Sequence, residues 1–199
     1  MINVYCTLSD VKNALAIEDI QDDLAIEAAI TAASRMIDNH TGRFFYKDGT
    51  TNAPVTRYYT PKDYWQCELD DVVTISEVAV DYNWDQEWNT IWTNTDYLLE
   101  PINNPRRGWP LTRILSTGSY VFDVLPQTLR VKGVWGWSSI PAEINLATRL
   151  QASRLFIRKQ SPFGVAGSSD LGTVRLSSRL DPDVEALVRP FRKMNGMAY

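Results

Sequence analysis

Hydrophobic residues recur at helical spacing towards both ends of the chain, and in between they nearly alternate with polar residues. Residues 8–16 and 22–41 carry an apolar side chain every three or four positions, which predicts two helices. Thr7 with Asp10 forms a variant of the capping box before the first helix, and Gly42 ends the second. The apolar stripe expected on the second helix consists of Leu24, Ala28, Ala32, Met36 and Ile37, flanked by Ile26, Ile30 and Ala33.

The middle of the chain, residues 44–137, has the composition of β-structure. Its apolar segments are rich in β-branched and aromatic residues, and Asn, Asp, Gly and Pro separate them. A turn at 83–86 predicts a hairpin between the strands on either side of it. The expected strands are residues 55–59, 74–82, 87–92, 96–101, 119–125 and 129–137.

Helical periodicity returns over residues 138–160, with Pro141 in the first turn, where its missing N–H costs nothing. This helix is apolar on more than one face, so we expect it to be buried on more than one side, as contact with a neighbouring subunit would achieve. One face carries Ile144, Ala147, Gln151 and Leu155, and another carries Leu146, Leu150 and Ile157.

Residues 161–199 begin as a glycine- and serine-rich segment and end in a short helix that Asp181 caps and Pro182 opens. The Gly-Val-Ala-Gly-Ser-Ser sequence at 164–169 follows a helix and lacks the Gly-Lys-Ser/Thr ending of a phosphate loop, which argues against nucleotide binding. We expect a docking arm that orders on a partner, with Thr173–Ser177 as an added strand. Deleting residues 161–199 should then leave the N-terminal core folded.

Together these elements predict an α+β fold. Two N-terminal helices and the long C-terminal helix form a helical bundle core, with a β-rich insertion and an extended C-terminal arm that ends in a short helix. The expected boundaries are 1–43 for the N-terminal helical part, 44–137 for the insertion, 138–160 for the long core helix, and 161–199 for the docking arm and terminal helix.

The composition bounds the class of protein. The chain has 199 residues, 44% hydrophobic and 22% charged, enough for one core and a smaller insert. Its apolar runs are far shorter than the roughly 20 residues of a membrane span, and the first ten residues do not resemble a signal peptide. Residues 1–129 hold 19 acidic and 9 basic residues, whereas residues 130–199 hold 5 acidic and 11 basic. Solvated helix faces explain this asymmetry most simply, but such halves could also meet complementary surfaces, including other copies of the chain.

The sequence offers no catalytic, cofactor-binding or metal site. Its single histidine, His40, lies at a helix end, where capping or packing is the usual role. Cys6 and Cys67 are too far apart for a zinc pair, and we expect them to be free buried thiols. The carboxylate clusters at 18–23 and 70–71 lack a calcium-loop pattern. A sequence pI near 5.0 makes the chain a poor phosphate binder.

Three segments resemble a known family. They read ASRMIDNHTGRFF at 33–45, YLLEPINNPRRGWPLTRI at 97–114, and a long stretch at 131–193 that begins VKGVWGWSSIPAEINLATRL. In this order they are similar to the head-to-tail adaptors of tailed bacteriophages, which are also called head-tail connector or head-completion proteins. The resemblance spans about residues 5–195 and contains no catalytic signature.

The resemblance implies a homo-oligomeric ring, usually of twelve copies, in the virion neck. The ring is expected to assemble in the host cytoplasm and to have no membrane as a partner. Such a ring docks under the portal protein, extends the channel through which genomic DNA passes without sequence-specific binding, and meets a stopper or tail-completion protein. The C-terminal segment commonly reaches the portal. The residues expected to contact the portal or a neighbouring subunit are Phe163, Leu171, Val174, Arg175, Leu176, Leu180, Leu187 and Phe191. Those expected to pack helices of adjacent subunits are Ile144, Leu150, Arg154 and Ile157.

Two alternatives remain open. A stopper or tail-completion protein is also small and ring-forming, but stoppers tend towards β-barrel cores, and the helical segments at both ends favour an adaptor. An enzyme such as a nuclease would need clustered His, Asp and Glu residues, and the sequence has no such cluster.

Overall fold

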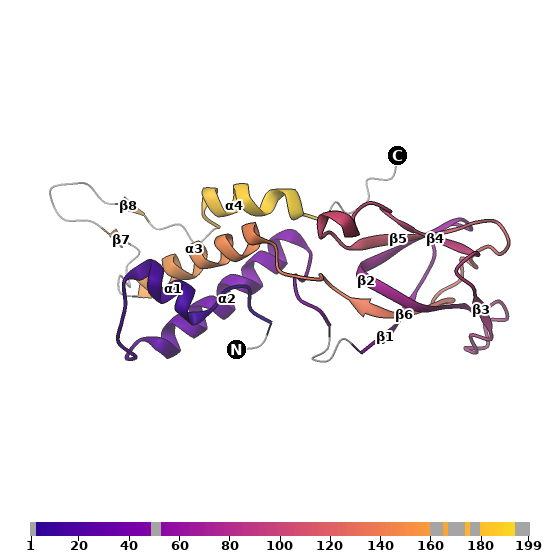
Figure 1. Cartoon of the computed structure of the whole chain (residues 1–199), viewed down its shortest axis with the longest axis horizontal. Helices are drawn as coiled ribbons and strands as arrows, with labels where there is room; N and C mark the ends of the chain where they lie inside the picture. The colour runs from indigo at the N-terminus through magenta and orange to yellow at the C-terminus, as the bar shows by residue number, and fades with distance from the viewer. Residues whose placement is uncertain (1–2, 49–52, 160–164, 167–173, 176–179, 194–199) are drawn as a thin grey trace. The chain divides into compact units, whose positions relative to one another are not determined.

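The chain folds as two compact units. A computed structural model describes residues 3–48, 53–159, 165–166, 174–175 and 180–193. Met1–Phe45 and Ile140–Tyr199 form a helical unit, and Tyr46–Ser139 form a β unit (Figure 1). The α+β class predicted from the sequence is confirmed. Among the described residues, no helix is long and apolar enough to cross a membrane.

The helical unit contains α1 (Leu8–Leu15), α2 (Asp23–Thr41), α3 (Ala142–Lys159), α4 (Pro182–Val188) and the 3-10 turn η2 (Arg189–Phe191). The predicted capping box opens α1: the N–H of Asp10 donates to the Thr7 hydroxyl at 3.1 Å, and the N–H of Thr7 donates to the Asp10 carboxylate at 2.8 Å. Gly42 ends α2 in the left-handed conformation, with φ of 68°. The helices expected on either side of the insertion, α2 and α3, do pack against each other.

The α2 helix buries Ile37 of the expected stripe together with the residues expected to flank that stripe, but not the start of the stripe. Ile26, Ile30 and Ala33 are fully buried and pack in one cluster with residues of α1 and α3. By contrast, Leu24 is 83% exposed, and Ala28 lies at the surface. Both stripes have helical spacing, but isoleucine side chains bury more apolar area than alanine side chains, so the core takes the isoleucine face.

A buried polar network fastens the segment before α1 to the helices. The Tyr5 hydroxyl donates to Asp38 of α2 and accepts the N–H of Phe45 at 3.1 Å. Arg35 pairs with the same Asp38 carboxylate at 2.8 Å, and Asn145 of α3 donates to the Tyr5 carbonyl at 2.8 Å. Burial, and then the bond to Asp38, raise the pKa of Tyr5 well above its ordinary value. The hydroxyl therefore remains a donor at any physiological pH.

The β unit is one antiparallel sheet in the order β1-β6-β2-β5-β4, with β3 paired to β2. The strand β2 is 15 residues long and changes partner along its length: β5 pairs with its first part, and β6 and β3 pair with its second. The β2–β3 pairing confirms the hairpin predicted around 83–86. The strands are β1 (Val55–Tyr59), β2 (Gln66–Val80), β3 (Thr90–Trp92), β4 (Tyr97–Glu100), β5 (Leu111–Ser116) and β6 (Leu129–Trp135), and the 3-10 turn η1 (Pro105–Arg107) precedes β5.

Three features of the sheet differ from the sequence prediction. The strand β5 was not among the expected strands. Residues 119–125 form no strand: Phe122 is buried and its N–H bonds to the Tyr64 carbonyl, but no ladder continues from there. The first part of β2 was missed because the acidic residues of Cys67–Asp71 hide its alternation. The sheet tolerates them because both aspartates are paired. The carboxylate of Asp70 pairs with Arg57 at 2.7 Å, and the carboxylate of the adjacent Asp71 accepts the indole N–H of Trp137 at 2.9 Å.

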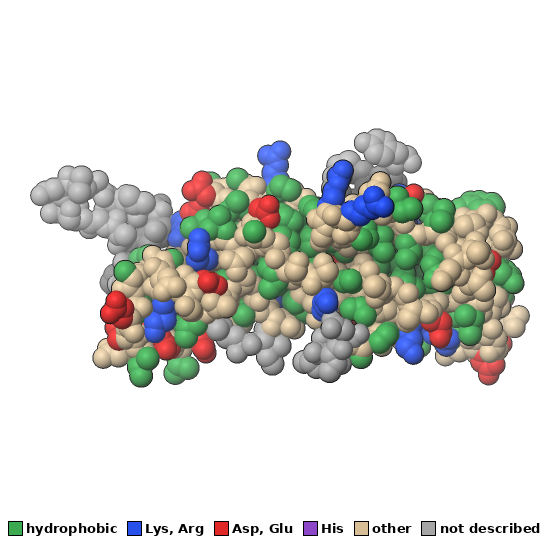
Figure 2. All heavy atoms as spheres, in the orientation of Figure 1, with side chains coloured by type: hydrophobic (Ala, Val, Ile, Leu, Met, Phe, Trp, Pro, Cys, Tyr) green, Lys and Arg blue, Asp and Glu red, His purple; other side chains and the backbone are tan. Residues whose placement is uncertain are grey.

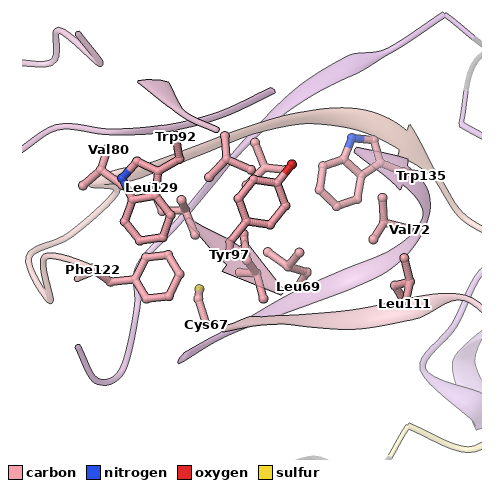
Figure 3. Packing of buried hydrophobic residues seen from close by; sticks show 13 residues of the cluster. Cys67, Leu69, Val72, Val80, Trp92, Tyr97, Leu111, Phe122, Leu129 and Trp135 are labelled. Carbon is pink, nitrogen blue, oxygen red and sulfur yellow. The ribbon is translucent and has the colours of Figure 1, made fainter. Parts of the chain in front are cut away.

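Large aromatic and branched side chains fill the core of the β unit. Figure 3 shows Tyr97 in the middle of this cluster, with Phe122 and Cys67 on one side and Trp135 and Val72 on the other. The buried indole of Trp135 also donates its N–H to the Val55 carbonyl at 2.8 Å, so its polar atom is satisfied. This core gives the β unit its own hydrophobic stabilisation.

The chain leaves β6 through Gly136, where the backbone fits no other residue. Gly136 has φ of 94°, and its N–H donates to the Asp71 carbonyl at 2.6 Å. A Cβ at this position would lie 1.9 Å from the Tyr46 carbonyl oxygen. The close approach of Tyr46–Lys47 to this turn therefore requires glycine.

We expect Gly136→Ala to destabilise the protein far more than Gly108→Ala. Gly108 also has positive φ, 74°, but nothing lies within 4 Å of a Cβ built there. Gly108→Ala should cost about 1 kcal/mol for the left-handed conformation, and Gly136→Ala at least about 3 kcal/mol because the backbone must also move. Urea unfolding followed by tryptophan fluorescence measures both. Equal costs would contradict the close contact.

Candidate interaction surfaces

The described part of the chain holds no group of three or more His, Cys, Asp and Glu residues placed to bind a metal ion. His40 is half-buried near the end of α2. Cys6 and Cys67 are buried and unpaired, as predicted. Burial raises the pKa of Cys6 to about 11 and that of Cys67 to about 12, so both thiols stay protonated at neutral pH and are poor nucleophiles. The outer surfaces of the two units are therefore the better candidates for function.

The two apolar faces predicted for α3 have different surroundings. Ile144, Ala147 and Gln151 are buried in the helical unit. On the other face, Leu150 is 39% exposed and Ile157 is 45% exposed. One face of α3 thus completes the core of its own unit, to which Ile144 belongs, and the other face is apolar and open to solvent.

The terminal helix is held on the helical unit by its side chains. Val184 and Val188 of α4 are buried, and so is Phe191 of η2. The Phe191 ring meets Phe45 edge to face, with the ring centroids 5.7 Å apart. Arg154 of α3, expected to face a neighbouring subunit, instead pairs with the Asp181 carboxylate at the start of α4.

Backbone bonds also hold the residues after α4. The N–H of Lys193 donates to the Thr41 carbonyl at 2.7 Å, and the side chain of Arg43 donates to the Phe191 carbonyl at 2.8 Å. The expectation that all of residues 161–199 can be removed without disturbing the core is therefore wrong for residues 180–193. Their removal would expose the apolar surface that α4 and η2 cover.

Three of the other residues predicted to contact a partner lie outside the described residues, namely Phe163, Leu171 and Leu176. Val174 and Arg175 form β8 (Val174–Arg175), which pairs antiparallel with β7 (Val165–Ala166). The two described residues of the segment expected to add a strand to a partner thus pair within their own chain. Leu180 and Leu187 are half-buried around α4.

A second apolar surface lies where α1 connects to α2, and the sequence reasoning missed it. Ile20 is 80% exposed and Leu24 is 83% exposed, the highest values among the exposed large hydrophobic side chains. Acidic residues surround them, and Figure 2 shows red and green side chains side by side at this end of the unit. The signal in the sequence was Ile20, an apolar residue between two acidic pairs at 18–19 and 22–23.

The β unit carries a cavity of about 320 Å³ beside its β2–β3 hairpin, lined by Asp81, Trp84, Gln86, Trp88, Pro126 and Gln127. Burial of the Asp81 carboxyl opposes its ionisation, but bonds from the backbone N–H groups of the turn, including those of Gln86 and Asn83, outweigh burial and lower its pKa. This carboxylate shapes the turn and is already occupied by its donors. The cavity therefore lacks a carboxylate free for catalysis.

Comparison with known proteins gives a fold but no family. No protein-family profile matches the sequence, and no curated protein is significantly similar to it. A chain from the neck of an empty gene transfer agent (GTA) particle, computed with C6 symmetry, has a similar fold, with a TM-score of 0.54 and 15% sequence identity. The similarity covers 98% of this chain and 93% of that chain. A chain from the neck of a native GTA particle, computed with C12 symmetry, gives a TM-score of 0.48 and 16% identity, covering 100% of this chain and 98% of that one.

Two isoleucines of α3 should respond very differently to the same substitution. Ile144→Ala removes a fully buried side chain and should cost about 2–5 kcal/mol of unfolding free energy. Ile157→Ala, at a position 45% exposed, should cost under about 1 kcal/mol, because alanine favours the helix and little buried area is lost. Denaturant unfolding of the monomeric protein measures both. Comparable losses would contradict the division of α3 into a core face and a surface face.

Proposed function

We propose that the chain is a structural subunit of the neck of a phage-like particle, and specifically a head-to-tail adaptor that forms a ring under the portal protein. The observation that carries this proposal is the fold similarity to a chain from a GTA particle neck, which extends over nearly the whole length of both chains. The order of the three resembling segments in the sequence points to the same class of protein.

The surface of the helical unit supports assembly into a ring. Leu150 and Ile157 leave an apolar face of α3 open, and such a face is stabilised by contact with another protein surface. A ring of twelve copies, which the family resemblance implies, is compatible with the C6 symmetry applied to the similar neck. In this ring the net charge of −4 would let genomic DNA slide through the channel without adhering to it.

The absence of a metal-binding cluster among the described residues and the high pKa of both thiols support a structural role over an enzymatic one. The alternative is a stopper or tail-completion protein of the same neck. The favoured role is the adaptor, since α1–α4 form a complete helical unit in addition to the sheet. The two roles differ in their partner: an adaptor binds the portal directly, and a stopper binds the adaptor.

Residues 161–179 are proposed as the segment that docks on the portal or on the next subunit. They follow α3 and precede α4, which is held on the core of its own unit. A test must therefore remove this segment and keep residues 180–193. Replacing 161–179 by a Gly/Ser linker of equal length does both, whereas deletion to the C-terminus would also open the core.

Electron microscopy of the chain mixed with the portal protein from the same particle tests this function. We expect a ring coaxial with the portal for the wild-type chain, and no ring on the portal for the linker variant, whose unfolding free energy should match that of the wild type. A wild-type chain that binds the stopper but never the portal would favour the alternative. A linker variant that still docks normally would refute the role of residues 161–179.

A further inference from the structure

The cavity beside the β2–β3 hairpin has the size and the lining of a small-molecule site. Its volume of about 320 Å³ lies at the lower end of the range for such sites. The lining residues come from the turn that follows β2 and from the loop that precedes β6. Two tryptophans and a proline supply apolar surface, and two glutamines and an aspartate supply polar atoms. Ligand sites commonly combine apolar walls with a few placed polar groups in this way.

Three of the residues that line the cavity have a backbone conformation that is unfavourable for them. The φ angles of Trp84, Gln86 and Gln127 are 55°, 66° and 60°, in the left-handed region that glycine adopts without strain. In the described part of the chain, the other residues besides glycine with positive φ are Asn3 and Ala16. Glycine would form the same turns at lower cost, which indicates a use for these three side chains beyond the turns themselves.

The two indole walls of the cavity are held in place. The N–H of the Trp84 ring donates to the Pro126 carbonyl at 3.3 Å, while the side chain remains 59% exposed. The Trp88 ring packs against Tyr58 with the ring centroids 4.7 Å apart, and the Arg130 guanidinium lies 5.7 Å from its centroid. Walls that are fixed before a ligand arrives lower the entropic cost of binding it.

The two glutamines offer hydrogen-bonding groups at positions that the backbone fixes. The backbone N–H of Gln86 donates to Asp81 at 2.8 Å, and that of Gln127 donates to the Thr60 hydroxyl at 3.0 Å. Their side-chain amides make no hydrogen bond within the described part of the chain, and both residues are exposed. Each amide can both donate and accept, so the two can bind hydroxyl groups of a ligand.

The charges around the cavity favour a neutral ligand. Asp81 is the charged residue of the lining, and its carboxylate already accepts the backbone N–H groups of Asn83 and Gln86. The lining contains no lysine or arginine, and Arg130 beside Trp88 pairs with Glu77 at 2.8 Å. A phosphate or carboxylate in the cavity would therefore lie near Asp81 without a cation in the lining to pair with it.

We propose that this cavity binds a neutral saccharide, one or two sugar units in size. A pyranose ring has an apolar face of C–H groups, which stacks on an aromatic ring, and a rim of hydroxyl groups, which donate and accept hydrogen bonds. The exposed indole of Trp84 suits the apolar face, and the amides of Gln86 and Gln127 suit the hydroxyl rim. This site does not depend on the proposed ring, so either can fail without the other.

Saturation-transfer NMR on the full chain tests the binding of saccharides. The probes are maltose, cellobiose, lactose and N,N′-diacetylchitobiose, with adenosine and hexaproline as ligands of other classes. One or more of the disaccharides should bind with a Kd on the order of 1 mM, as expected for a stacking contact and a few neutral hydrogen bonds. Trp84→Ala should weaken this binding about tenfold or more. Trp65→Ala is the matched control, because Trp65 is 58% exposed in the same unit and does not line the cavity.

Glycine substitution separates a role in binding from a role in the fold. Gln86→Gly and Gln127→Gly should retain or raise the urea concentration at the unfolding midpoint, because glycine adopts the same φ without strain. Each should weaken disaccharide binding about threefold or more, because each removes one amide. If both variants bind the disaccharide as the wild type does, or if the wild type binds none of the disaccharides, the proposal is wrong. Binding of adenosine or hexaproline in place of the disaccharides would overturn it as well.

Discussion

The helix α3 imposes the constraint on which the rest of the helical unit depends. Its inner face, with Ile144 and Ala147, must be covered by α1, α2 and α4 for the unit to have a core. Its outer face, with Leu150 and Ile157, carries apolar side chains that the unit leaves open. Burying such side chains contributes about 1.5–3 kcal/mol each, so the outer face remains a source of binding free energy for another protein surface. The proposed assembly follows from this division.

The terminal helix shows how the unit separates its own stability from its contacts. Residues 180–193 return to the core through Val188 and Phe191 and through the bond from Lys193 to Thr41. The segment at 161–179 lies between two anchored elements, α3 and α4, so its binding to a partner need not disturb the core. Tyr5 anchors the N-terminal segment in a similar way, since its bonds to Asp38 and Asn145 tie this segment to α2 and α3.

The sequence predicted the elements better than it predicted their exposed faces. The helices, the β2–β3 hairpin and the α+β class follow from periodicity and turn residues, which are local signals. The buried face of α2 was predicted only in part: Ile37 is buried as expected, but Leu24 is exposed and the flanking Ile26 is buried instead. The two stripes have the same period, so the larger isoleucine side chains and their packing against α1 and α3 decide between them. The first part of β2 was missed because its acidic residues are compensated by Arg57 and Trp137, partners distant in the sequence.

The difference between local signals and long-range packing also explains what the sequence revealed about the interaction surfaces. The two apolar faces of α3 were visible from spacing alone, but their assignment to core and surface needed the fold. Arg154 was expected at a subunit contact, and its partner within the chain, Asp181, lies 27 residues away. That the acidic and basic parts of the sequence meet complementary surfaces stays a prediction.

The central claim is that the open face of α3, which carries Leu150 and Ile157, becomes buried when the chain assembles. Hydroxyl-radical footprinting of the monomeric and the assembled protein, read by mass spectrometry, measures this directly. The account predicts that oxidation of Leu150 and Ile157 falls strongly on assembly, while labelling of the buried Ile144 stays low in both states. Unchanged labelling of Leu150 and Ile157 in the assembled protein would contradict it.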